Sequence, residues 1–428
     1  MNIAAALMSL FEDRLNAAKS LLAPAHDREL VLAIGALFFL FPLSKTVYVL
    51  ALVLAIVFSV RQANPTPWWD LIRATPLLWF PIAIYLLVLL QAPTSPADTS
   101  DVLEHLRKYA RLLFLVFFFL VFVGQERRQQ VALQGFTAAM VLIVVVTWIR
   151  IVWSSPLLGS QTDGSAFFGD HITQNIMVAF FTLIAFQNAR KSKTRPMRIV
   201  WGALLLLSVL SITHYSIGRT GQILLLAVWI SYVAFMLRGI KLMMACVLIA
   251  SLSWISYNSS DHLKSRFEQA VSEARSADTD RLTSIAHRLY NYQTTPRMIA
   301  EKPIFGHGTG AYHTQICRFI DHPEQCSNFQ RHPHNQFLFF AAEHGLIGCA
   351  FYIAFVLGLF VCAFRSGARP AARVMLFAFA VMLFINSFIN SPLFSSRESQ
   401  FFALMAALLI AMNHPTSGGK TAGETAHG

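Results

Sequence analysis

The sequence has few charged side chains for its length. Asp, Glu, Lys and Arg make up 13% of the 428 residues, whereas hydrophobic residues make up 55%. A soluble protein of this length needs much more polar surface to stay in solution. The scarcity of charge therefore excludes an ordinary soluble enzyme. It indicates that apolar segments form the architecture of a membrane protein.

The N-terminus lacks the features of a cleavable export signal. Glu12, Asp13 and Arg14 stand where such a signal would be apolar. Apolar residues recur from Leu7 onward at helical spacing. We therefore expect residues 1–29 to form an amphipathic helix along the cytoplasmic surface of the membrane.

Apolar runs long enough to cross a bilayer as helices recur along the rest of the chain. We predict an all-α, polytopic membrane protein with about twelve transmembrane helices. Nine fall within 30–257 and three within 336–412, followed by a cytoplasmic tail over 413–428. The expected spans are 30–43, 46–60, 75–91, 109–123, 131–153, 171–186, 199–213, 220–237, 240–257, 346–364, 372–388 and 401–412.

Lys and Arg collect in alternate loops, which predicts the orientation of the spans. Arg127, Arg128 and the five cations within 190–198 then lie inside, whereas the short outside loops carry mainly acidic residues. Both termini are expected in the cytoplasm of a bacterium, with the chain in its inner membrane. The net charge of +12 then reflects topology and anionic lipid head groups rather than nucleic-acid binding.

One connection, residues 258–335, is much longer than the others. The alternation of spans places it in the periplasm, and loops of this length are usually functional. Its short amphipathic stretches predict helices lying on the membrane surface. Cys317 and Cys326 fall in this large loop. In an oxidising compartment we predict a disulfide between them, with two free thiols as the alternative.

The first of three polar clusters on the predicted periplasmic side is the sequence 331–335. Pro333 suits the first turn of a helix, so His334 and Asn335 would stand at the start of the next span. A neutral imidazole there would accept a proton from a sugar hydroxyl, because its ordinary pKa lies close to ambient pH. The alternative is a histidine that caps a helix or contacts lipid phosphate.

The helix expected after His334 carries small residues at every fourth position, Ala341, Gly345 and Cys349. Small residues at this spacing let a neighbouring helix approach closely. We therefore expect a tightly packed helix pair at this point.

The other two clusters each contain an arginine. Arg219 stands at the head of a predicted helix, where a helix N-terminus and a guanidinium fork would bind phosphate oxygens. Equally, it would snorkel to lipid head groups. Arg288 lies in the large loop, ahead of a Gly-rich stretch over 303–312. Taken alone, Arg288 reads as a solvated surface charge and the Gly-rich stretch as a tight turn.

Two patterns that suggest metal sites are disfavoured. Asp278 and Asp280 match the DxD pattern of enzymes that use nucleotide sugars, but those donors are cytoplasmic and this loop is expected outside. The histidines of the large loop lack the paired helical spacing of a zinc site. We therefore expect no metal site and no cofactor.

The segment after His334 resembles the O-antigen ligase and polymerase superfamily. That family carries a histidine followed by Asn, Ser or Gln, then nine residues, Gly, two residues, and Gly, Thr or Tyr. His334, Asn335, Gly345 and Gly348 match each of these positions. The match extends to the predicted topology, with one large periplasmic loop late in the chain.

Two arginines strengthen the resemblance. Arg219 matches a family arginine at a periplasmic helix start, and Arg288 matches a second one ahead of a Pro-x-x-Gly-x-Gly stretch, here 303–308. One departure is Ile223, which stands where the ligases often have Leu. That change keeps the apolar character of the position.

The resemblance implies a metal-independent, inverting glycosyltransferase of the membrane-embedded C type. It would transfer a glycan from undecaprenyl diphosphate to the lipid A core oligosaccharide. His334 would be the general base, Arg219 and Arg288 would bind the diphosphate, and Asn335, Gly345 and Gly348 would support the site. An O-antigen polymerase or a protein O-oligosaccharyltransferase with the same donor is the alternative. A transporter is disfavoured because the sequence shows no internal repeat.

Overall fold

The computed structural model describes residues 25–62, 65–153, 167–216, 218–275, 284–320, 326 and 331–414. Within these ranges the chain is helical and contains no β-strand, which confirms the predicted all-α class. The amphipathic helix expected over 1–29 lies almost entirely outside the described residues. So does the tail expected over 413–428.

Eight helical segments among the described residues are long and apolar enough to cross a membrane, and each coincides with a predicted span. The chain is therefore a polytopic membrane protein. The eight segments are Pro76–Thr94 (with α5, Trp79–Gln91), α8 (Glu126–Val152), α9 (His171–Lys191), Arg195–Tyr215 (with α10, Arg195–Leu210), α11 (Arg219–Met236), α12 (Gly239–Ser259), α16 (Gln336–Arg365) and α17 (Pro370–Ile389).

The other four predicted spans are also helices, but shorter or more polar ones. Helices α2 (Ala25–Leu40) and α3 (Val47–Gln62) each have 16 residues, and α7 (Arg111–Phe122) has 12. Helix α18 (Ser396–Asn413) begins with charged residues and is buried along nearly its whole length. Because protein rather than lipid surrounds α18, its composition is not limited by the hydrocarbon environment.

Helix α18 forms the centre of the bundle. The ring of Phe401 on α18 contacts the rings of Phe136 on α8, Phe180 on α9 and Phe379 on α17. Such aromatic pairs add about 0.5–1.5 kcal/mol each beyond the area that they bury. The start of α18 is thereby held in a fixed place between helices from both halves of the chain.

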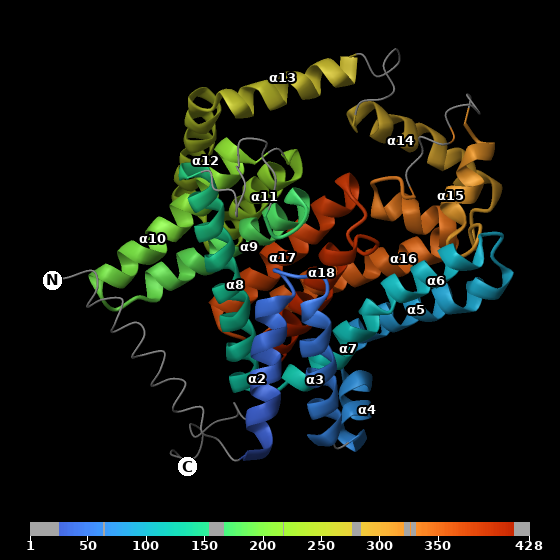
Figure 1. Ribbon diagram of the computed structural model, residues 1–428, viewed down its shortest axis with the longest axis horizontal. Helices are drawn as coiled ribbons and strands as arrows, with labels where there is room; N and C mark the ends of the chain where they lie inside the picture. The colour runs from blue at the N-terminus through green and yellow to red at the C-terminus, as the bar shows by residue number, and fades with distance from the viewer. Residues whose placement is uncertain are drawn as a thin grey trace.

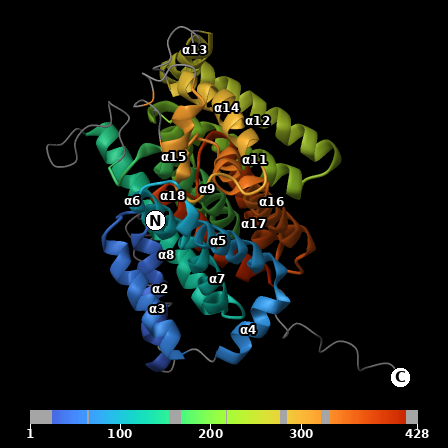
Figure 2. The same cartoon turned by 90° about the vertical axis from the view of Figure 1, so that its right-hand side faces the viewer.

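Shorter helices lie at the two ends of the bundle. The large loop contributes α13 (Asp261–Arg275), α14 (Ser284–Glu301) and α15 (Ala311–Gln315). In both views α13 and α14 lie at one end and α4 (Pro65–Ala74) at the other (Figures 1 and 2). Helix α6 (Thr99–Tyr109), near α16, completes the set.

A disulfide joins Cys317 and Cys326, with their Cα atoms 5.4 Å apart. Both cysteines pack against a small apolar cluster that includes Met298 of α14, Tyr312 of α15 and Phe339 of α16. The bridge therefore holds the last part of the large loop against α14, α15 and α16, the helix that follows His334.

Candidate functional site

The segment that carries His334 ends on the N-cap of α16. Asn335 is the cap residue, and its Oδ1 accepts hydrogen bonds from the backbone N–H groups of Phe337, at 3.0 Å, and Leu338, at 3.1 Å. Asn is favoured at this position because its side chain satisfies N–H groups that lack a partner within the helix. The expectation that Pro333 lies in the first turn is wrong, since the cap lies two residues beyond it.

The backbone of His334 adopts the left-handed region, with φ of 55°. This conformation costs of order 1–3 kcal/mol for a residue other than glycine and persists only where neighbours hold it. The Tyr292 hydroxyl on α14 donates to the carbonyl oxygens of His334, at 3.4 Å, and of Phe388 at the end of α17. Three separate elements therefore meet at the backbone of His334.

Arg288 lies on the same face of α14 as Tyr292, four residues away along the helix, and its charge acts on His334. Burial and the positive charge of Arg288 lower the pKa of His334 to about 4, although a hydrogen bond to Asn390 acts in the opposite direction. At neutral pH the imidazole is therefore uncharged. A base must be in that form before it can accept a proton.

Arg219 is the first residue of α11. Its two terminal guanidinium nitrogens donate to the two carboxylate oxygens of Glu273 on α13, each over 3.1 Å. Burial lowers the pKa of Arg288, and Arg219 and Glu273 act on it in opposite directions. The structure thus brings Arg219 and Arg288 within electrostatic range of one another, and Arg288 within range of His334.

The Gly-rich stretch 303–308 docks on α16 rather than forming a separate phosphate loop. Its backbone exchanges hydrogen bonds with α16 on both sides of Gly345: His307 N donates to Ala342 O at 3.0 Å, and Leu346 N donates to Pro303 O at 2.8 Å. Two sequence motifs, the Gly-rich stretch 303–308 and the segment around Gly345, therefore contact each other directly.

Gly345 makes this docking possible. Its φ is 68°, so the helix is interrupted there, and a Cβ would overlap the backbone of Ile304. The expectation that Ala341, Gly345 and Cys349 mark a helix–helix contact is therefore wrong at Gly345, which admits an irregular loop. At Gly348 a Cβ would crowd the Cβ of His344, at 2.5 Å.

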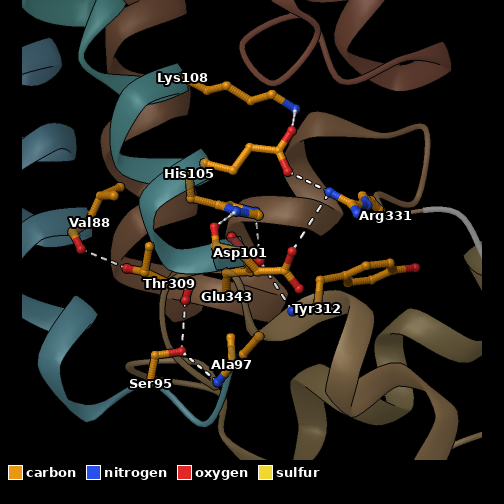
Figure 3. Close-up of polar contacts among 12 residues, drawn as sticks. Val88, Ser95, Ala97, Asp101, His105, Lys108, Thr309, Tyr312, Arg331 and Glu343 are labelled. Atoms are coloured by element: carbon orange, nitrogen blue, oxygen red, sulfur yellow. Dashed lines mark hydrogen bonds and ion pairs between the residues drawn. The ribbon is translucent and has the colours of Figure 1, made fainter. Parts of the chain in front are cut away.

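A network of charged residues on α6 fixes the segment before His334 (Figure 3). Arg331 forms an ion pair of 2.6 Å with Glu104 and lies 3.7 Å from a carboxylate oxygen of Asp101. Lys108 also pairs with Glu104, at 2.9 Å, and its ammonium lies 3.4 Å from the centre of the Phe394 ring. The first half of the chain thereby anchors the loop that leads to His334.

Glu343 continues this network inside α16 (Figure 3). The side chain is fully buried, 3.3 Å from the imidazole of His105, and it accepts a hydrogen bond of 3.2 Å from the backbone N–H of Tyr312. Glu343 thus ties α6 and α15 to the interrupted part of α16. Sequence reasoning missed this residue, although an acidic residue in an otherwise apolar helix was a usable signal.

A second polar group that sequence reasoning missed joins α17 to α18. Asn386 and Asn390, at the end of α17, both donate to the buried carboxyl group of Glu398 on α18. Two amides four residues apart in an apolar helix are unusual, so this spacing was also a usable signal.

The described part of the chain contains no group of three or more His, Cys, Asp or Glu side chains placed to hold a metal ion. Asp278 and Asp280, which match the DxD pattern, lie outside the described residues.

Comparison with known proteins found two similarities. None of the curated proteins compared with the chain matches it. A chain from a solved structure described as "Structural coordination of polymerization and crosslinking by a peptidoglycan synthase complex" is 17% identical, with a TM-score of 0.47; the match covers 79% of this chain and 96% of that one. Residues 203–353 match the family model described as O-Antigen ligase, a range that includes Arg219, Arg288 and His334. Over residues 203–353 the chain is therefore similar to the O-antigen ligase family.

Proposed function

We propose that this protein transfers O-antigen polysaccharide from undecaprenyl diphosphate to the lipid A core oligosaccharide, at the periplasmic face of the bacterial inner membrane. The observation that carries the proposal is that an uncharged His334 lies within the electrostatic range of Arg288, and Arg288 within that of Arg219. A base beside two cations suits the attack of a hydroxyl on a sugar that departs from a diphosphate.

His334 is the general base in this proposal. As the acceptor hydroxyl attacks, its O–H bond breaks and the proton passes to the imidazole. The acceptor oxygen forms a bond to the anomeric carbon while the bond from that carbon to the diphosphate oxygen breaks. The electron pair leaves with the diphosphate, and direct displacement inverts the anomeric centre. The low pKa of His334 keeps the base uncharged before the donor binds.

The two arginines neutralise the charge that grows on the leaving diphosphate. A guanidinium can bind two phosphate oxygens at once, so it both neutralises the phosphate and fixes its orientation. Arg219 already presents both terminal nitrogens to the carboxylate of Glu273. The same fork would bind phosphate oxygens, so the proposed reaction needs no metal ion to bind the leaving group.

The orientation follows from the distribution of cations in the loops. Helices α13 and α14, which carry Glu273 and Arg288, lie at the end of the bundle opposite α4 (Figures 1 and 2). Arg73 is in the last turn of α4, on the side where Lys and Arg collect. The site end of the bundle then faces the periplasm, where lipid-linked O-antigen and lipid A core would meet.

The acceptor distinguishes this function from its relatives. An O-antigen polymerase or a protein O-oligosaccharyltransferase would use the same donor and the same three residues. The test is complementation of a ligase-deficient bacterium, in which the lipopolysaccharide ladder on a gel reports transfer to lipid A core. Wild type, His334→Ala and His313→Ala are compared, because His313 is an exposed histidine of α15 in the same loop.

We expect wild type and His313→Ala to restore the ladder and His334→Ala to give none at an equal level in the membrane. A ladder from His334→Ala would overturn the role of general base. Failure of wild type to restore the ladder despite insertion would contradict ligation. Assay with a sugar or protein acceptor would then decide between the polymerase and the protein-modifying enzyme.

A further inference from the structure

Cations gather at the end of the bundle opposite Arg219 and His334. Arg219 begins α11 and His334 precedes α16, whereas the loops that follow α11 and α16 lie at the other ends of these helices. Five Lys or Arg residues fall within 190–198, after α9, two within 238–241 and three within 365–373. The sequence has no Asp or Glu over 171–260 or 344–397. The segments that carry these cations therefore supply no acidic partner for them.

Two of the arginines are held against the last turns of α11. The Nη1 group of Arg190 donates to the hydroxyl of Tyr232 at 2.9 Å. The guanidinium carbon of Arg373 lies 5.5 Å from the centre of the Phe235 ring. Tyr232 and Phe235 are three residues apart, so their side chains are neighbours on the helix surface. Arg190 of α9 and Arg373 of α17 therefore flank one short stretch of α11.

Helices α9 and α17 also contact each other at this end. The side-chain amide of Gln187 on α9 donates to the carbonyl oxygen of Ala371 on α17, at 3.3 Å. Gln187 lies three residues before Arg190, and Ala371 lies two residues before Arg373. The spacing between the two arginine-bearing segments is therefore set by packed helices rather than by a free loop.

Helix α16 fixes Arg373 from a further side. The Nε group of Arg373 donates to Ala363 O at 3.1 Å, and its Nη2 group donates to Phe364 O at 2.9 Å. Both carbonyl groups belong to the last turn of α16, where a cation is favoured. Arg365 follows directly and is exposed. Arg190, Arg365 and Arg373, which come from three helices, are called the cation cluster below.

An exposed apolar stripe leads away from the cation cluster along α16. Leu357, Val361 and Phe364 are 54%, 48% and 54% exposed. They recur at intervals of four and three residues, which places them on one face of the helix. The ring of Phe364 lies 5.5 Å from that of Phe235, against which Arg373 packs. Positive charge at the helix end is therefore continuous with apolar surface along the helix, the combination that a phospholipid requires.

We propose that the cation cluster binds the head group of an anionic phospholipid with two phosphate groups, and that an acyl chain lies along the α16 stripe. A guanidinium binds phosphate oxygens in a bidentate fork, and basic sites between transmembrane helices bind such head groups. Three guanidinium groups carry more charge than one phosphate neutralises, so a head group with two phosphates fits better. The cation cluster lies at the far end of α11 and α16 from Arg219 and His334, so its ligand does not depend on the proposed transfer reaction.

The test measures lipid binding by the full-length protein, purified in a neutral detergent and stripped of bound lipid. Cardiolipin, phosphatidylglycerol and phosphatidylcholine are added in mixed micelles, and native mass spectrometry counts the lipids retained. The unfolding temperature gives a second readout, because a ligand that binds only the folded state stabilises it. The variants are Arg190→Gln/Arg373→Gln, Arg365→Gln and the matched control Lys193→Gln/Arg195→Gln, which removes the same charge from exposed positions.

We expect wild type to bind cardiolipin about tenfold more tightly than phosphatidylglycerol, and to retain no phosphatidylcholine. Arg190→Gln/Arg373→Gln should weaken cardiolipin binding by about tenfold or more, because two charge-assisted contacts are lost. Arg365→Gln should weaken it by about threefold to tenfold, since one such contact is lost. Lys193→Gln/Arg195→Gln should bind cardiolipin like wild type and show the same rise in unfolding temperature.

Equal losses in Arg190→Gln/Arg373→Gln and in the control would overturn the inference, because diffuse positive charge would then be sufficient. Equal binding of cardiolipin and phosphatidylglycerol would overturn the assignment of two phosphates. If the double variant does not fold, Arg365→Gln decides, since the exposed side chain of Arg365 can be replaced without disturbing the packing. Binding by Arg365→Gln as tight as that of wild type would then contradict the site. Transfer is not measured, so failure of the proposed function would leave these results unaffected.

Discussion

Arg219 and Glu273 form a bidentate ion pair between the start of α11 and the large-loop helix α13, with both nitrogen–oxygen distances at 3.1 Å. The side chain of Glu273 is 9% exposed and that of Arg219 is 25% exposed. In the proposed function, a diphosphate that binds Arg219 must replace this carboxylate. The ion pair between Arg219 and Glu273 would therefore have to break before the donor binds.

Glu273→Gln is expected to lower the KM for the lipid-linked donor. The ion pair competes with the diphosphate, and partly exposed pairs are worth up to about 1 kcal/mol, or roughly fivefold in affinity. The measurement is donor KM with acceptor at saturation. Glu268→Gln, an exposed acid on the same helix, is the control and should leave KM unchanged. A higher KM in Glu273→Gln would mean instead that the carboxylate is needed to orient Arg219.

Arg219→Lys is expected to lower kcat/KM by about tenfold to a hundredfold, because a lysine keeps the charge but cannot bind two phosphate oxygens in a planar fork. Steady-state transfer from the lipid-linked donor measures the change. Arg275→Lys, at an exposed position on α13, should behave like wild type. Full activity of Arg219→Lys would show that charge alone is sufficient at this position.

The sequence predicted the fold correctly where the bilayer restricts which residues a segment can contain. Apolar length predicted helices at all twelve positions, and Arg219 and His334 were recognisable because polar groups at a membrane edge are uncommon. A helix directly after His334 was expected, but the apolar span was predicted to begin only at 346, since Glu343 and His344 interrupt the apolar run; α16 begins at Gln336. Their partners, among them His105 on α6, are contacts across the fold.

The hydrogen bond of Asn390 was hidden for the same reason. Its amide donates to Glu398 from the next helix. A pattern within one helix shows that a polar residue is present. Only the packed structure shows which group it contacts.

The pH profile of kcat/KM is expected to fall only as the pH drops through about 4, the pKa of His334. The base acts in its uncharged form, so activity is present above the pKa and lost below it. An ordinary histidine would lose activity from a pH of roughly 6.5. A limb at that ordinary value would contradict the effect of burial and of Arg288.

Arg288→Gln tests the cause of this low pKa. Removing the positive charge weakens one of the effects that lower the pKa of His334, so the acid limb should move to higher pH even though activity falls. The quantity to measure is the pH at which kcat/KM falls on the acid side of the profile, and not the maximum of kcat/KM. Arg318→Gln, an exposed arginine of the same loop, should leave the limb unchanged. An unmoved limb in Arg288→Gln would assign the shift to burial alone.

Gly345→Ala is expected to destabilise the folded protein in detergent and to reduce transfer. A Cβ at position 345 would overlap the backbone of Ile304, and its φ of 68° disfavours any residue with a side chain. The strain alone costs of order 1–3 kcal/mol, and the stretch 303–308 would have to move away from α16. Gly202→Ala is the matched control, because the added Cβ has nothing within 4 Å. In the interior of a helix the control should gain about 0.5–1 kcal/mol.

Thermal unfolding in detergent, followed by size-exclusion chromatography of heated samples, measures both variants. Gly345→Ala should unfold at a lower temperature than wild type and Gly202→Ala at the same or a higher one. If Gly345→Ala were as stable as wild type and fully active, the docking of 303–308 against the interrupted helix would not be needed. Because that docking begins at Ala342, eight residues after His334, a loss of transfer in a variant that stays folded would show that the interruption also positions His334.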